Sequence, residues 1–192
     1  MKNNIKILKF FVENKNKQFS IKSISDTLKI NYRIVYEEVL NLKKENLIKI
    51  EKKGNNNLCT FDYNYNSNVL HVEEIRKNEL FKNKDIFLIY KRIKEIKNPF
   101  YILLIFGSYS NKTATKSSDI DLCLITDNKN IKDSVQSILN ITPVKVHFNE
   151  FTTNEFVSML KEREENLGHQ IVNNNIILYG IESFYELVKY VK

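Results

Sequence analysis

The sequence lacks any hydrophobic run long enough to cross a bilayer. Its longest unbroken apolar stretch covers residues 100–106, well short of the roughly 20 residues that a membrane-spanning helix needs. The residues after Met1 are polar and do not resemble the apolar segment of a secretory signal. We therefore expect a soluble protein of the cytoplasm that has no membrane partner.

Cysteine is also scarce, and the sequence has no internal repeat. Cys59 and Cys123 fall in different strand-like segments, and neither has metal-ligand spacing to a histidine. We expect buried, reduced thiols rather than a zinc site or a disulfide. The Asn-rich pieces at 55–57 and 173–175 are too short for low-complexity domains and indicate turns.

The charge is distributed unevenly along the chain. The 192 residues exceed a typical domain of roughly 100 to 150 residues, which predicts two compact units. The net charge is +6 over residues 1–66, +3 over 67–98 and −2 over 99–192. A basic first region favours a polyanionic partner. The alternative is a general enrichment in Lys, Asn and Ile that has nothing to do with binding.

Residues 1–66 have the pattern of three amphipathic helices followed by a hairpin. The helices are expected at about 4–14, after the N-cap Ser20, and from Tyr32 to about Glu45. Two apolar runs, 47–50 and 58–61, then flank a basic tip rich in Gly and Asn. This order resembles a winged helix-turn-helix domain.

The resemblance implies a DNA-binding surface on the third helix and the hairpin. In such domains the third helix enters the major groove and the wing follows the phosphate backbone. The residues expected to contact DNA are Tyr32, Arg33, Tyr36, Lys43, Lys52 and Lys53. The competing interpretation is that this domain serves dimerisation or docking and that its lysines are merely solvated.

Residues 67–98 carry apolar positions interleaved with Lys, Arg and Glu, which predicts one long or two short amphipathic helices. We interpret them as a helical linker that could mediate a homodimer. The Asn98-Pro99 pair marks its end, and residues 99–192 form the last predicted domain.

The residues with the clearest chemistry lie at the start of that last domain. A continuously apolar strand, 100–106, runs directly into Gly107-Ser108, where the backbone can approach phosphate oxygens. Asp119 and Asp121 follow at the start of a second apolar strand. Because side chains alternate along a strand, both carboxylates point to one face. Mg²⁺ suits such a pair, because it binds one or two carboxylates together with phosphate oxygens.

This spacing of Gly-Ser and Asp-x-Asp, with Ser118 before the first aspartate, resembles the minimal nucleotidyltransferases of the DNA polymerase β superfamily. The resemblance implies an α/β (α+β) domain with a small mixed sheet flanked by helices. It implies a nucleoside triphosphate substrate and Mg²⁺ or Mn²⁺ as cofactor. It also implies that Gly107, Ser108 and Ser118 bind nucleotide, and that Asp119 and Asp121 bind metal and are catalytic.

The family normally supplies a third carboxylate from a neighbouring strand, which is expected here at 144–148. Lys145 and His147 share its outward face, and no acid stands there. Glu150 lies at the strand's end with the wrong parity, and His147 is a candidate base, although an isolated histidine is more often structural.

Two hypotheses follow from these residues. The first is a Mg²⁺-dependent enzyme that transfers a nucleoside monophosphate to an unidentified acceptor, with a winged helix that binds DNA or dimerises. The alternative is a DNA-binding transcriptional regulator whose degenerate nucleotidyltransferase domain senses nucleotide without turnover. Neither the acceptor, the donor base nor a DNA sequence follows from the residues.

Overall fold

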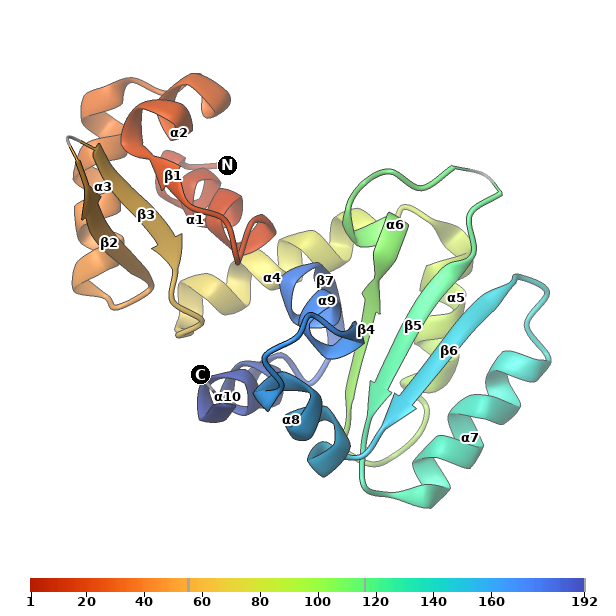
Figure 1. Cartoon of the computed structure of the whole chain (residues 1–192). Coiled ribbons are helices and arrows are strands. Elements are labelled where there is room, and N and C mark those ends of the chain that lie inside the picture. The colour runs from red at the N-terminus through yellow and green to blue at the C-terminus, as the bar shows by residue number, and fades with distance from the viewer. Residues whose placement is uncertain (55, 116, 192) are drawn as a thin grey trace. The chain divides into compact units, whose positions relative to one another are not determined.

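The computed structural model describes residues 1–54, 56–115 and 117–191 (Figure 1). The chain divides into two compact units, Met1–Glu73 and Glu74–Lys192. None of the helices in the described ranges combines the length and apolar character that crossing a membrane requires.

In its described residues, the first unit contains three complete helices, the first half of a fourth and a three-stranded antiparallel sheet with the strand order β1-β3-β2. Its elements in chain order are α1 (Asn3–Glu13), β1 (Phe19–Ser20), α2 (Ile21–Leu28), α3 (Tyr32–Lys44), β2 (Ile48–Lys53) and β3 (Asn56–Phe61). The predicted N-caps are present, because the side chain of Ser20 accepts from Ser23 N and that of Asn31 accepts from Arg33 N. Strand β1 was not predicted, since two residues are too few to show a period.

Helix α4 (Ser67–Leu80) contains the boundary between the units. Within the first unit, its Glu73 forms an ion pair with Lys15, with 3.1 Å between Oε1 and Nζ. Both side chains are almost completely buried. An ion pair in such surroundings needs its partner, because a lone buried charge is strongly unfavourable. The N-terminal half of α4 is therefore part of the first unit.

The second unit is built on a mixed four-stranded sheet with the order β6-β5-β4-β7, as the resemblance implies. Only β5 and β6 pair in parallel among the described strands. The strands are β4 (Ile102–Phe106), β5 (Ile120–Ile125), β6 (Val146–Phe151) and β7 (Asn175–Tyr179). The helices are α5 (Lys84–Ile93), α6 (Gly107–Ser110), α7 (Lys129–Asn140), α8 (Thr153–Lys161), α9 (Leu167–Asn173) and α10 (Ile181–Val191).

Helices α5 and α7 cover one face of this sheet (Figure 1). Alternate residues of β4 and β5, among them Ile105 and Leu122, pack with buried residues of both helices such as Ile89 and Val135. Helix α5 lies in the stretch interpreted as a linker, yet it contributes to the core of the second unit. Helix α7 was not predicted, although it is the crossover that a parallel β5–β6 pair requires.

The face that α5 and α7 leave uncovered contacts α8. The side chain of Phe151 in β6 packs on Phe156 of α8, with 6.0 Å between the ring centroids. The predicted capping box at Thr152 and Glu155 starts α8.

Cys59 and Cys123 are buried free thiols, as predicted, and burial raises the pKa of Cys59 to about 11.

Candidate functional site

The site begins where β4 ends, at Gly107. Gly107 has a φ of +67°, which a residue with a side chain rarely adopts. A Cβ added to it would overlap the Asp121 carboxylate, approaching its Cγ to 3.0 Å. The pairing of Phe106 with Asp121 across β4 and β5 produces this approach. The structure thus brings together the glycine of Gly-Ser and the second aspartate of Asp-x-Asp.

Ser108 lies in α6, and Ser118 lies in the segment between α6 and β5. The carbonyl of Ser108 accepts a hydrogen bond from Thr113 N at 3.0 Å. Ser118 Oγ accepts from Thr115 N at 2.9 Å, and its carbonyl accepts from the Tyr109 hydroxyl at 3.4 Å. Both serines therefore shape the loop that joins Gly107 to the aspartates.

Asp119 and Asp121 flank a buried residue, Ile120, which is 2% exposed and belongs to the core. Asp121 lies in β5, whereas Asp119 immediately precedes it. Their side chains are 24% and 26% exposed. The alternation expected from the sequence is present, so both carboxylates reach solvent on the same side of the strand.

Strand β6 places two basic side chains opposite these carboxylates. His147 pairs in register with Asp121. Its Nε2 lies 3.3 Å from Asp119 Oδ2 and its Nδ1 lies 3.4 Å from Asp121 Oδ1. Lys145 Nζ donates a hydrogen bond to Asp119 Oδ2 at 2.7 Å. His147 thus lies between the two aspartates, on the strand that we expected to carry a third carboxylate.

Glu150 is not brought to this cluster. It pairs in register with Leu124, whose side chain lies in the core on the α5 and α7 face. Its carboxylate forms an ion pair with Lys132 of α7, with 3.7 Å between Oε1 and Nζ. Its parity in β6, opposite to that of His147, accounts for this placement.

Asp119 and Asp121 are the groups that suit a divalent cation. Among the described residues, no three or more His, Cys, Asp or Glu side chains form a cluster that could hold a metal by themselves. Two carboxylates nevertheless fit Mg²⁺, because this ion commonly takes one or two carboxylates and completes its shell with water and substrate phosphates. The absence of a side chain at Gly107 lets the Asp121 carboxylate lie directly against the backbone at the end of β4.

Comparison with known proteins agrees with this geometry. Residues 90–183 match the family described as Polymerase beta, Nucleotidyltransferase. They form a nucleotidyltransferase domain of the polymerase beta type. The chain is also similar to a solved structure described as "Crystal structure of the toxin-antitoxin with AMP-PNP", with 17% identity and a TM-score of 0.33 over 56% of this chain and 80% of that one. No curated protein shows significant similarity to the chain.

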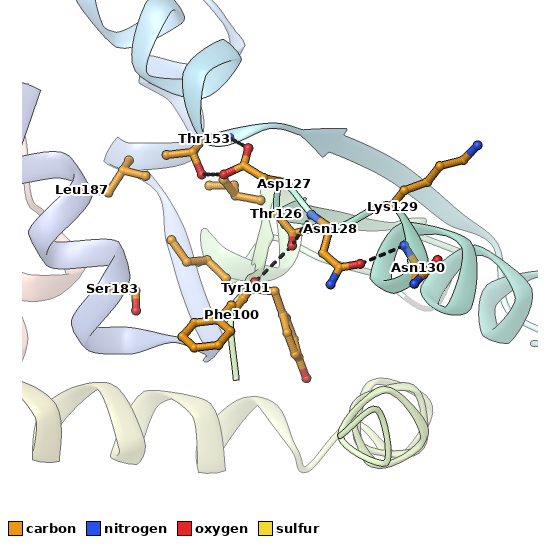
Figure 2. A pocket seen from close by; sticks show the side chains of 12 residues that line it. Phe100, Tyr101, Thr126, Asp127, Asn128, Lys129, Asn130, Thr153, Ser183 and Leu187 are labelled. Atoms are coloured by element: carbon orange, nitrogen blue, oxygen red, sulfur yellow. Dashed lines mark hydrogen bonds between the residues drawn. The ribbon is translucent and has the colours of Figure 1, made fainter. Parts of the chain in front are cut away.

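The nucleotidyltransferase domain contains a cavity at the other end of its sheet (Figure 2). Its volume is about 700 Å³. Two of the polar side chains around it bind the backbone: Thr126 Oγ1 donates to Phe100 O at 3.1 Å, and Asn128 Oδ1 accepts from Asn130 N at 2.9 Å. Asp127 accepts from both Thr153 N and Thr153 Oγ1, at 2.9 and 2.8 Å. The cavity is therefore bordered by helix caps, far along β5 from the aspartates.

The residues predicted to contact DNA lie on α3 and β2 of the first unit. Tyr32 and Tyr36 are 52% and 42% exposed, and their rings stack with 6.4 Å between centroids. Arg33 is exposed and its Nε donates to Glu37 Oε1 at 2.9 Å. Lys43, Lys52 and Lys53 are exposed as well. The structure thus presents all six side chains at the surface.

Proposed function

We propose that the second unit is a Mg²⁺- or Mn²⁺-dependent enzyme that transfers a nucleoside monophosphate from a nucleoside triphosphate to an acceptor hydroxyl. The observation that carries this proposal is the approach of Gly107 to the Asp121 carboxylate, with Asp119 beside it. Asp119 and Asp121 would hold a divalent cation, which would neutralise charge on the triphosphate and orient an in-line attack.

The chain's own residues have separate roles in this reaction. Gly107 leaves room for the Asp121 carboxylate beside the backbone, while Ser108 and Ser118 shape the segment between them. The acceptor oxygen bonds to the α-phosphorus, the bond from that phosphorus to the β-bridging oxygen breaks, and pyrophosphate leaves. The acceptor proton passes to a base, for which the ring of His147, 3.3 Å from Asp119 Oδ2, is the candidate.

Incubation of the full chain with labelled ATP, GTP, CTP or UTP and Mg²⁺ tests this proposal. Candidate acceptors include nucleic acid, small molecules and the protein itself. We expect label transfer by the wild type and none by Asp119→Asn combined with Asp121→Asn. Absence of transfer from all four nucleotides to every acceptor would contradict the proposed reaction.

A second function is favoured by one specific observation. Lys145 and His147 stand opposite the aspartates, and the nearest acid of β6, Glu150, faces α7. A site without a third carboxylate could bind nucleotide without turning it over, as a sensor in a transcriptional regulator. Nucleotide binding in a calorimeter without pyrophosphate release, together with nucleotide-dependent retention on DNA, would favour this function over transfer.

We further propose that the first unit is a winged helix that binds DNA. The order of three helices and a β2–β3 hairpin supports this, as do the exposed side chains of α3 and the wing. Each lysine that contacts phosphate should add about one to the salt dependence of binding. Fluorescence anisotropy with duplex DNA should therefore show a smaller salt slope for Lys52→Ala, whereas Lys6→Ala, an exposed lysine on α1, serves as control.

Sedimentation of the full chain without DNA tests the other role that a winged helix can serve. A homodimer that Tyr32→Ala dissociates, together with no measurable DNA affinity at low salt, would identify α3 as a dimer interface. A monomer that binds DNA with a steep salt dependence supports the DNA-binding proposal.

A further inference from the structure

At the proposed metal site, acidic side chains at the start of β5 lie opposite basic side chains at the start of β6. Asp121 pairs with His147 and Ile120 with Val146. Ile120 N donates to Lys145 O at 3.1 Å, which continues the pairing to the residue before each strand. Asp119 and Lys145 are therefore held opposite each other by the backbone, and their side chains meet at 2.7 Å.

This ion pair occupies the carboxylate that a metal ion would use. Asp119 Oδ2 accepts from Lys145 Nζ and also lies 3.3 Å from His147 Nε2. Two carboxylates on one side of a strand repel each other, so a nearby cation stabilises them when no metal is bound. The Lys145 ammonium supplies that charge from within the chain.

The pair is also one that can open. The Lys145 side chain is 71% exposed, whereas that of Asp119 is 24% exposed. An exposed ion pair contributes little stability and its lysine can change partners through solvent. The polyphosphate of a nucleotide offers this ammonium several charged oxygens, with which lysine forms charge-assisted hydrogen bonds.

We propose that Lys145 is an internal counter-ion that regulates the site, competing with the divalent cation for Asp119 until a nucleotide draws it away. This inference rests on the proposed function, since it assumes that Asp119 binds metal. The two ligands are then thermodynamically coupled: metal binds weakly to the nucleotide-free protein and more tightly when nucleotide is bound. By linkage, bound metal raises the affinity for nucleotide by the same factor.

Binding of Mn²⁺ to the full chain, followed by electron paramagnetic resonance, tests the competition without relying on activity. The variants are Lys145→Met, which removes the charge, and Lys145→Arg, which keeps it. Lys129→Met is the matched control, because Lys129 is an exposed lysine at the opposite end of the sheet. Each is measured alone and with the α,β-methylene analogues of ATP and GTP.

Without nucleotide, Lys145→Met should bind Mn²⁺ about two- to fivefold more tightly than the wild type, the range that an exposed ion pair supports. Lys145→Arg and Lys129→Met should match the wild type. With an analogue present, Lys145→Met should lose that advantage and bind the analogue more weakly, because the ammonium no longer contacts phosphate.

Two negative results have different meanings. Equal Mn²⁺ affinity of the wild type and Lys145→Met without nucleotide would overturn the counter-ion role and leave the proposed function intact. Failure of every variant to bind Mn²⁺, with or without the analogues, would overturn the proposed function as well. Circular dichroism melts of the variants show whether each is folded.

Discussion

The two ends of the sheet in the second unit differ in what their polar side chains contact. At one end, the carboxylates of Asp119 and Asp121 contact the side chains of Lys145 and His147. At the other end, the Asp127 carboxylate accepts from the backbone and hydroxyl of Thr153 at the start of α8. The contacts of Asp119 and Asp121 join one side chain to another, whereas those of Asp127 join a side chain to the end of a helix.

This difference separates a site that can bind a ligand from a structural one. A helix N-terminus that loses its cap leaves unsatisfied N–H groups, so Asp127 cannot change partners without destabilising α8. Asp119 can exchange Lys145 for another cation, because both partners reach solvent. A cavity of about 700 Å³ lies at the structural end, so in this domain the chemistry of the side chains identifies the candidate site and the presence of a cavity does not.

The largest expected effect is the loss of transfer on neutralising both aspartates. Asp119→Asn with Asp121→Asn should lower the rate of nucleotidyl transfer at least about 100-fold, because metal and triphosphate charge are no longer stabilised. Labelled-nucleotide incorporation measures this. Asp133→Asn, at an exposed position of α7, should retain the wild-type rate. Transfer that survives in the double variant would break the distinction between the two ends.

The second effect concerns Gly107. Gly107→Ala should weaken nucleotide binding by at least about tenfold and lower stability by about 1 to 3 kcal/mol, because its Cβ meets Asp121 and its φ of +67° is strained. Gly54→Ala separates these causes. Gly54 has a similar φ of +61°, and its added Cβ meets no described atom within 4 Å. It should therefore lose stability but keep nucleotide affinity, as measured by calorimetry and urea unfolding.

The third prediction probes the structural end of the sheet. Asp127→Ala should lower the free energy of unfolding by about 1 kcal/mol, because the first N–H of α8 loses its acceptor. Nucleotide affinity should not change. Urea unfolding and calorimetry measure the two quantities, with Asp133→Ala expected within about 0.5 kcal/mol of the wild type. A tenfold loss of nucleotide affinity in Asp127→Ala would place a ligand at this end.

The smallest effect is a pH dependence at the same end. Hydrogen bonds from the backbone N–H and then the hydroxyl of Thr152 lower the pKa of Glu155. Because the folded pKa is depressed, the capping box stabilises the protein above the ordinary carboxyl pKa. That stability is lost as pH falls through the folded value. Nuclear magnetic resonance titration should show the lowered pKa in the wild type and a smaller lowering in Thr152→Ala, which loses the hydroxyl but keeps the backbone N–H.

Much of the site could be predicted because its determinants are local. The alternation of Asp119, Ile120 and Asp121 follows from strand geometry, and Gly107 follows from a backbone conformation that side chains disfavour. The caps at Ser20, Asn31 and Thr152 were also predicted, since each involves residues two or three apart. Such features depend on neighbours in the chain and need no knowledge of the fold.

What only the tertiary structure decided depends on residues far apart in sequence. The parallel pairing of β5 with β6 places Lys145 and His147 against the aspartates, although Lys145 and Asp119 are 26 positions apart in the sequence. The packing of α5 and α7 on one face sends Glu150 to Lys132 and leaves His147 between the carboxylates. The sequence by itself determined which groups are the candidates for the chemistry. Strand pairing and helix packing decided which of them meet, because no local pattern specifies the register between distant strands.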